Sequence, residues 1–288
     1  MSDLDQRIHP IRADAASDAY RGKVDRPRYL PALRRRIAAA STLLYRGPGY
    51  DQPIDSEGLH GEDVDVFEME SGWSWVQLTG DGYVGYIESA ALAETVQPAA
   101  THHVQSLRTY VYPQPSIKTR DKCLISMNAR VSVASFDGQF AMLADGAGYV
   151  FAADLLPNDQ YQSDFVSVAE RFLHTPYRWG GRTSLGLDCS GLVQMALRAA
   201  GVSAPRDTDL QERAIGKALP DPSDFSCLQR GDLVFWKGHV GIMSDADTLL
   251  HATGHYMRVV AEPLLQAAER IKTQGQAVTG IRRLAGPG

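Results

Sequence analysis

The chain has 288 residues, more than one average domain needs, so we expect two or three domains. Hydrophobic residues make up 44% and charged residues 22%, a composition that excludes general disorder. The 29 basic and 34 acidic residues give a net charge of −5, which argues against a large basic surface for nucleic acid or an anionic membrane.

The cysteines and the N-terminus bear on the compartment. Cys123, Cys189 and Cys227 form no disulfide framework and no CxxC metal motif, which favours a reducing compartment. The N-terminal residues mix acids and bases without an apolar run, so we expect neither a secretory signal nor a membrane anchor. We therefore expect a cytoplasmic protein with no nucleic-acid or membrane partner, and the oligomeric state stays open.

The first part of the chain predicts a short lead-in followed by strands. Residues 1–38 are polar, and we expect them to be extended or to form a short helix packed on a later domain. Within residues 39–98, apolar and polar positions alternate around Val64 and Val66 and again around Trp75, and Asp81-Gly82 is typical of a hairpin turn. This pattern predicts a small β-barrel.

Residues 99–157 repeat the same order of strands and turns. Gly82-Tyr83-Val84 in the first module corresponds to Gly148-Tyr149-Val150 in the second. Each module resembles a bacterial SH3-like barrel of the cell-wall type. We expect a linker near residue 157 between these modules and a C-terminal domain.

Residues 158–288 predict a mixed helical and stranded domain. An apolar stripe that includes Phe165, Val168 and Phe172 predicts a helix ending at Pro176. A loop rich in glycine and aromatic residues, a second helix and several short strands follow. The fold class expected for the whole chain is α+β, with a central antiparallel sheet in this last domain.

Cys189 stands at the start of the second predicted helix. It precedes a segment whose apolar residues repeat with helical spacing as far as Gly201. A thiol at a helix N-terminus feels the positive end of the helix dipole and free backbone N–H groups, which favour the thiolate and can hold an oxyanion. Cys189 is therefore the candidate nucleophile, although a free cysteine is more often an inert core residue.

Two histidines follow on predicted strands. The segment GDLVFWKGHVGIMS predicts a hairpin whose second strand begins at His239, and LLHAT places His251 on a further buried strand. A nucleophile, a base and a group that orients the base are the three roles of covalent acyl transfer, although each histidine alone is more often structural. His255 is a rival for the third role, but its neighbours predict a turn.

These segments together carry a resemblance. YRWGG, LDCSGLV, APRDTDLQ, GDLVFW, HVGIM and LLHAT, in this order, resemble the NlpC-type family of cell-wall cysteine peptidases. The resemblance implies a papain-like fold with Cys189 as nucleophile, His239 as general base and His251 as the residue that orients the imidazole. It also implies a substrate cleft lined at positions matching the family motifs, which are Tyr177, Trp179, Asp188, Ser190, Asp207 and Thr208.

Two of these positions carry a qualification. Thr208 stands where serine is frequent in relatives. Asp188 has an alternative role as the N-cap of the helix that begins at Cys189, and both roles are compatible.

Two residues of the first barrel complete the expected substrate site. Glu62 and Tyr83 match positions that, in similar three-domain murein-peptide hydrolases, meet the substrate amine together with Asp188. The resemblance therefore implies selectivity for peptides with a free N-terminal L-alanine. The alternative is that Glu62 is a solvated acid and that Tyr83 only packs.

The expected function is hydrolysis of the γ-D-glutamyl bond to a diamino acid in murein peptides, as in endopeptidases of the dipeptidyl-peptidase VI type, in cell-wall recycling. No cofactor or metal is expected, because His102 and His103 are adjacent on a strand and face opposite sides. The preferred diamino acid stays open. The alternatives are an acyltransferase or amidase with the same nucleophile, or a wall-binding scaffold with vestigial catalysis.

Overall fold

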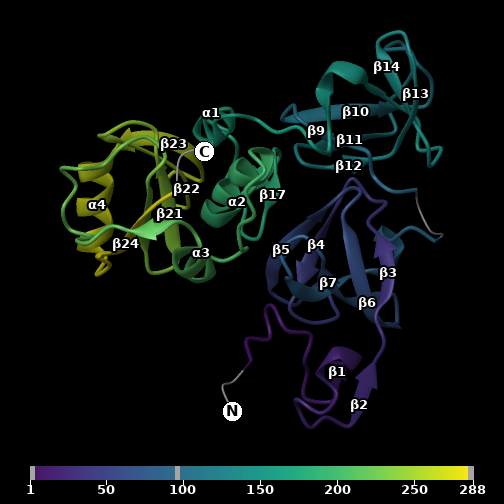
Figure 1. Cartoon of the computed structure of the whole chain (residues 1–288), viewed down its shortest axis with the longest axis horizontal. Coiled ribbons are helices and arrows are strands. Elements are labelled where there is room, and N and C mark those ends of the chain that lie inside the picture. The colour runs from purple at the N-terminus through teal and green to yellow at the C-terminus, as the bar shows by residue number, and fades with distance from the viewer. Residues whose placement is uncertain (1–3, 95–97, 285–288) are drawn as a thin grey trace. The chain divides into compact units, whose positions relative to one another are not determined.

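The computed structural model describes residues 4–94 and 98–284. The chain divides into two compact units, residues 1–158 and residues 159–288 (Figure 1). Antiparallel sheets dominate both units, and α1–α4 all belong to the second. The predicted α+β class is confirmed. Within the described residues, no helix is long and apolar enough to cross a membrane.

The N-terminal segment packs on the first barrel. Its strands β1 (Ala15–Ser17) and β2 (Arg28–Leu30) pair in parallel, and Ala15 is buried against Phe67 and Trp75. The segment is therefore docked, and its two short strands replace the helix that was one of the expectations for this region.

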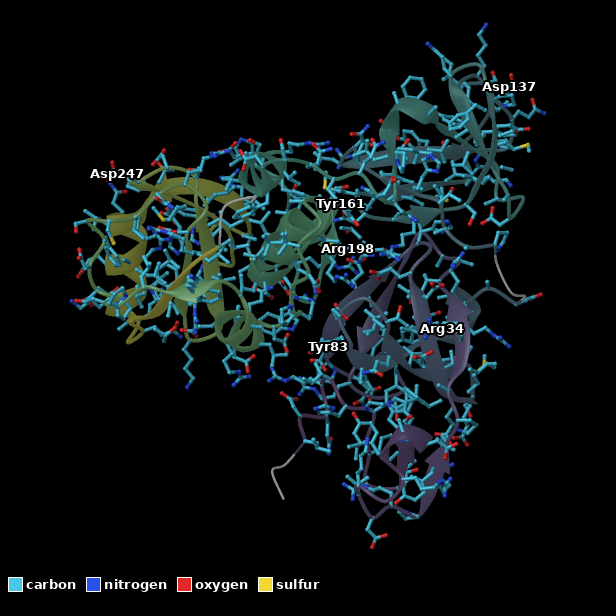
Figure 2. The ribbon with its side chains drawn as sticks, in the orientation of Figure 1. Arg34, Tyr83, Asp137, Tyr161, Arg198 and Asp247 are labelled. Carbon is cyan, nitrogen blue, oxygen red and sulfur yellow. The ribbon has the colours of Figure 1, made fainter. Side chains whose placement is uncertain are left out.

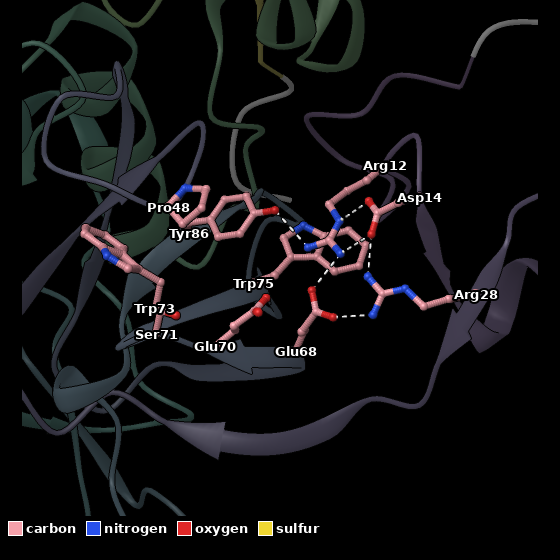
Figure 3. A pocket seen from close by; sticks show the side chains of 10 residues that line it. All are labelled: Arg12, Asp14, Arg28, Pro48, Glu68, Glu70, Ser71, Trp73, Trp75 and Tyr86. Atoms are coloured by element: carbon pink, nitrogen blue, oxygen red, sulfur yellow. Dashed lines mark hydrogen bonds and ion pairs between the residues drawn. The ribbon is translucent and has the colours of Figure 1, made fainter.

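Four charges fasten this segment. Arg12 binds Asp14 at 2.8 Å and Glu68 at 2.6 Å, and Arg28 binds the same two carboxylates (Figure 3). The Arg12 guanidinium also lies 4.4 Å above the centre of the Trp75 ring. These four residues line a hollow together with Pro48, Glu70, Ser71, Trp73, Trp75 and Tyr86. Each of these four charged side chains has a partner of opposite sign, so we interpret the cluster as a structural contact that holds the N-terminal segment on the barrel.

The first barrel is built on one six-stranded sheet, in the order β3-β6-β7-β8-β4-β5. Its strands are β3 (Leu33–Arg36), β4 (Ser41–Tyr45), β5 (Ile54–Leu59), β6 (Asp63–Glu70), β7 (Trp73–Leu78) and β8 (Val84–Glu88). Strand β3 lies within the range expected as a lead-in. It pairs with β6, and ion pairs from Arg34 to Asp65 and from Arg36 to Asp63 reinforce this edge. Figure 2 labels Arg34.

The second barrel has sheets ordered β11-β10-β15-β14-β13 and β12-β9-β16. Its strands are β9 (His102–Val104), β10 (Arg108–Tyr112), β11 (Cys123–Ser126), β12 (Arg130–Val131), β13 (Val133–Asp137), β14 (Phe140–Leu143), β15 (Tyr149–Phe151) and β16 (Leu155–Pro157).

The internal repeat is visible in the two barrels. In the β7–β8 turn, Asp81 accepts the N–H of Tyr83 at 3.0 Å, and in the β14–β15 turn Asp145 accepts the N–H of Ala147 at 2.9 Å. Each closing strand is then followed by a single 3₁₀ turn. The predicted duplication and the predicted Asp81-Gly82 hairpin are both confirmed.

The second unit is built on an antiparallel six-stranded sheet, β19-β24-β20-β21-β22-β23. Helices α1 and α2 lie on one side of this sheet and α4 on the other (Figure 1). The elements are α1 (Phe165–Glu170), β17 (Arg182–Thr183), β18 (Gly186–Leu187), α2 (Cys189–Ala199), α3 (Thr208–Ala214), β19 (Lys217–Ala218), β20 (Leu233–Trp236), β21 (His239–Met243), β22 (Thr248–Thr253), β23 (Arg258–Pro263), α4 (Leu264–Thr273) and β24 (Val278–Arg283).

Helix α1 is shorter than predicted. It ends at Glu170, whereas the apolar stripe predicted a helix as far as Pro176. The N–H of Arg171 bonds to the carbonyl of Val168, three residues back, and His174 adopts a left-handed φ of 69°. The chain therefore leaves the helix through tight turns before the proline is reached.

Candidate active site

Cys189 is the first residue of α2 and is 6% exposed. Asp188 caps this helix, since its Oδ1 accepts the N–H of Gly191 at 2.8 Å. A side chain at position 191 would place its Cβ 2.4 Å from the carbonyl oxygen of Gly181, so glycine is required for this approach. The predicted helix start and the N-cap role of Asp188 are confirmed.

A buried arginine holds the capping residue. Arg206 donates to both oxygens of Asp188, at 3.0 and 2.6 Å, and to Ser190 Oγ at 2.8 Å. Asp188 also accepts the N–H of Gly180 at 2.9 Å. Gln211 donates to the carbonyl of Ser190 at 3.0 Å, which ties the segment after Arg206 to the first turn of α2. Sequence reasoning missed Arg206, whose only signal was its place within the motif APRDTDLQ.

The thiol of Cys189 lies against the backbone around His239. Its Sγ is 3.9 Å from the carbonyl oxygen of Gly238, and the N–H groups of Val240 and Ser190 are directed at it. Burial raises the pKa of Cys189 to about 12, and these N–H groups lower it by less. Burial therefore opposes the thiolate that the helix start favours.

His239 and His251 meet on neighbouring strands. His239 begins β21 opposite Trp236, in the predicted hairpin, and its Nε2 lies 2.7 Å from Nδ1 of His251 on β22. Gly241 lies between them, where a Cβ would approach Leu249 within 2.6 Å and His251 within 3.2 Å. Glycine at this position leaves room for the contact between the two rings.

The surroundings of His239 disfavour its charged form. Burial lowers the pKa of His239 to about 3, and the neighbouring imidazole of His251 and guanidinium of Arg270 act in the same direction. The carboxylate of Glu262 opposes them. Burial therefore favours the neutral imidazole of His239, as it favours the neutral thiol of Cys189.

Glu262 and Arg270 continue the line of polar contacts from His239 and His251. Sequence reasoning missed both residues. Oε1 of Glu262 on β23 lies 2.8 Å from Nε2 of His251, and Arg270 on α4 binds both oxygens of Glu262 at 2.5 and 2.8 Å. His255 lies in the exposed turn after β22, with its ring edge-to-face with that of Tyr256. His251 rather than His255 therefore contacts His239.

The remaining predicted residues of the second unit differ in exposure. Tyr177 is half-buried, and burial raises the pKa of its hydroxyl, an effect to which Cys189 and Asp188 add. Trp179 is 66% exposed on the same loop. Asp207 and Thr208 are half-exposed where α3 begins. Their substrate roles, like those of Ser190 and Asp188, stay predictions.

Glu62 and Tyr83 belong to the first unit. Glu62 is 4% exposed between β5 and β6, and its Oε2 accepts the N–H of Leu59 at 2.9 Å. Tyr83 is 3% exposed and belongs to the barrel core. The alternative of a solvated Glu62 is therefore wrong, whereas contact of either residue with substrate stays a prediction.

The other two cysteines lie elsewhere. Cys123 is half-buried on β11 and Cys227 is exposed, and both are free thiols. In residues 4–94 and 98–284, no three His, Cys, Asp or Glu side chains gather in a way that could hold a metal ion.

Comparisons with known proteins agree with this arrangement. Residues 174–274 match the model of the NlpC/P60 family, and residues 44–92 match that of the bacterial dipeptidyl-peptidase Sh3 domain. Dipeptidyl-peptidase 6 of Lysinibacillus sphaericus is 29% identical over 239 residues, which cover 75% of this chain and 86% of that protein. Gamma-D-glutamyl-L-lysine dipeptidyl-peptidase of Bacillus subtilis is 28% identical over 221 residues, which cover 70% of this chain and 73% of that protein.

A solved structure shares the fold. The crystal structure of an NlpC/P60 family protein from Bacillus cereus superposes with a TM-score of 0.73 at 21% identity, over 88% of this chain and all of that one. The predicted SH3-like and papain-like architecture is confirmed. Together, the two matched domains, the relatives and the thiol at the start of α2 show that residues 174–274 form an NlpC/P60 domain and that the chain is a cysteine peptidase.

Proposed function

We propose that this peptidase hydrolyses the bond between γ-D-glutamate and a diamino acid in murein peptides. The observation that carries the proposal is the placement of Cys189 beside the backbone of residues 238–240, with His239 in contact with His251. Two relatives named as dipeptidyl-peptidases, one of them for the γ-D-glutamyl-L-lysine bond, support the choice of substrate.

The proposed hydrolysis starts from the neutral thiol of Cys189 and the neutral imidazole of His239. As Sγ of Cys189 bonds to the γ-carbonyl carbon, its proton passes to the imidazole of His239. The imidazolium then protonates the departing amine of the diamino acid as the C–N bond breaks. Water attacks the thioester, gives one proton to His239, and releases L-Ala-γ-D-Glu, after which the proton returns to Sγ. N–H groups at the start of α2 are positioned to stabilise the oxyanion.

We propose that the substrate carries a free N-terminal L-alanine. A buried carboxylate favours a positively charged partner, and Glu62 is such a group in the first barrel. The hydrogen bond from the N–H of Leu59 orients that carboxylate.

We also propose that the enzyme acts in the cytoplasm on peptides recovered from the cell wall. Cys123, Cys189 and Cys227 are all free thiols, which supports a reducing compartment. A small peptide with a free amine is also the form of substrate that wall turnover yields.

The test is product analysis by mass spectrometry with L-Ala-γ-D-Glu-meso-diaminopimelate and its L-lysine counterpart. We expect L-Ala-γ-D-Glu and the free diamino acid from at least one of the two peptides. An added amine should not be incorporated, which separates a hydrolase from an acyltransferase. Intact peptides, or cleavage after L-alanine, would refute the proposal.

A further inference from the structure

Four side chains from four consecutive elements of the second unit form an unbroken polar chain. His239 on β21, His251 on β22, Glu262 on β23 and Arg270 on α4 are joined by contacts of 2.7, 2.8 and 2.5 Å. The register places Glu262 opposite Leu249, two residues before His251, so Glu262 and His251 share one face of the sheet. Helix α4 packs against β22 and β23 and supplies Arg270.

We propose that Glu262, held by Arg270, is a positioning residue that sets the proton arrangement of both imidazoles. An ionised carboxylate only accepts hydrogen bonds, so Nε2 of His251 must carry the proton that faces Glu262. Nδ1 of a neutral His251 is then an acceptor, and Nε2 of His239 must donate to it. The free lone pair of His239 is thereby confined to Nδ1, the ring nitrogen that is left for the thiol of Cys189.

The state of Glu262 fits this role. Burial raises the pKa of the Glu262 carboxyl group. Hydrogen bonds from His251 and Arg270 lower it by more, so the resulting pKa is about 2. Glu262 therefore stays ionised at every pH at which a peptidase of this kind is assayed. His251 is fully buried, so no solvent molecule competes for its ring nitrogens.

Replacement of Glu262 by glutamine removes the negative charge and keeps the size and shape of the side chain. Arg270 carries only donors, so it draws the amide oxygen of Gln and turns the NH₂ group toward His251. His251 must then accept at Nε2 and carry its proton on Nδ1, where it opposes the N–H of His239. Replacement of Arg270 by methionine leaves the carboxylate in place, and the double variant frees the amide to turn its oxygen back toward His251.

The inference rests on the proposed function, so the experiment has an arm that needs no substrate. The proton position on His251 is read from ¹⁵N shifts of histidine-labelled full-length protein. We expect protonated Nε2 in the wild type and Arg270→Met, and protonated Nδ1 in Glu262→Gln. Protonated Nδ1 on His251 in the wild type, or no change in Glu262→Gln, would overturn the proposal whether or not any peptide is cleaved.

The second arm measures hydrolysis of the tripeptide. Glu262→Gln should lower kcat at least about tenfold with KM nearly unchanged, Arg270→Met should lower kcat less than about threefold, and the double variant should be faster than Glu262→Gln. A merely structural ion pair predicts equal losses in the two single variants and no recovery in the double variant.

The pH profile gives a third readout. The charged or titratable groups around His239 are Cys189 on α2, His251 on β22, Glu262 on β23 and Arg270 on α4. Glu262 raises the pKa of His239 and Arg270 lowers it. The acidic limb of kcat/KM should therefore move to lower pH in Glu262→Gln and to higher pH in Arg270→Met. An acidic limb that does not move in either variant, or that moves in the same direction in both, would contradict the positioning role of Glu262.

Discussion

Nη2 of Arg206 lies 2.6 Å from Oδ2 of Asp188, and the Arg206 side chain is only 1% exposed. This ion pair fixes the residue that caps α2 and so fixes the position of Cys189. Removal of one partner leaves a buried charge without compensation, which is a large destabilisation.

Arg206→Met should therefore lower the free energy of unfolding by about 3–5 kcal/mol, as measured by chemical denaturation. The matched control is Arg213→Met, which removes the exposed pair with Asp209 and should change stability by less than about 1 kcal/mol. Similar values for the two variants would show that the Asp188–Arg206 pair does not hold the start of α2.

We expect His251 to position His239 and not to exchange protons with the substrate. His251→Ala should lower kcat by about 10- to 100-fold with little change in KM, whereas His239→Ala should remove nearly all activity because the proton acceptor is lost. Steady-state kinetics on the tripeptide measure both. Full activity in His251→Ala would refute the positioning role.

The pH dependence should show a wide plateau. Burial lowers the pKa of His239 below its ordinary 6.5 and raises that of Cys189 above its ordinary 9.0. The active pair holds one proton, so activity is lost only when His239 gains a second proton in acid or Cys189 loses its own in alkali. Measured kcat/KM should therefore be nearly flat across neutral pH. A narrow bell with limbs near 6.5 and 9.0 would instead show that burial does not shift the pKa values of these two groups.

Selectivity for a free amine depends on Glu62. N-acetylated tripeptide should be cleaved at least about tenfold more slowly than the free peptide, because a charge-assisted contact is lost. Glu62→Gln should lower kcat/KM for the free peptide only, which narrows the difference between the free and acetylated peptides. The glutamine amide oxygen can still accept the N–H of Leu59. Equal kcat/KM for the two peptides in the wild type would exclude this role of Glu62.

Much of the site could be predicted because its signals are local in sequence. The start of α2 at Cys189, the hairpin that presents His239 and the strand of His251 each lie within one short segment with a clear period or turn. The two barrels were visible for the same reason, since their hairpins repeat the same turn residues.

The missed residues depend on contacts between segments distant in sequence. Glu262 reaches His251 through the register of β22 with β23, and Arg270 reaches Glu262 only because α4 packs on that face. Arg206 looks like an exposed charge until its segment folds over α2. The N-terminal segment had no periodic signal, because its strands are three residues long and are held by ion pairs and by two buried alanines, Ala15 and Ala16.

Cleavage by cysteine variants tests the central claim most directly. Purified wild type, Cys189→Ala and the control Cys123→Ala/Cys227→Ala are each incubated with L-Ala-γ-D-Glu-meso-diaminopimelate and with its L-lysine counterpart, and L-Ala-γ-D-Glu is quantified by mass spectrometry. The wild type and the control should release the dipeptide from at least one of them at similar rates, because neither Cys123 nor Cys227 lies at the site. Cys189→Ala should release none while keeping its folded structure, because the attacking sulfur is absent. Release of the dipeptide by Cys189→Ala would contradict the assignment of Cys189 as nucleophile.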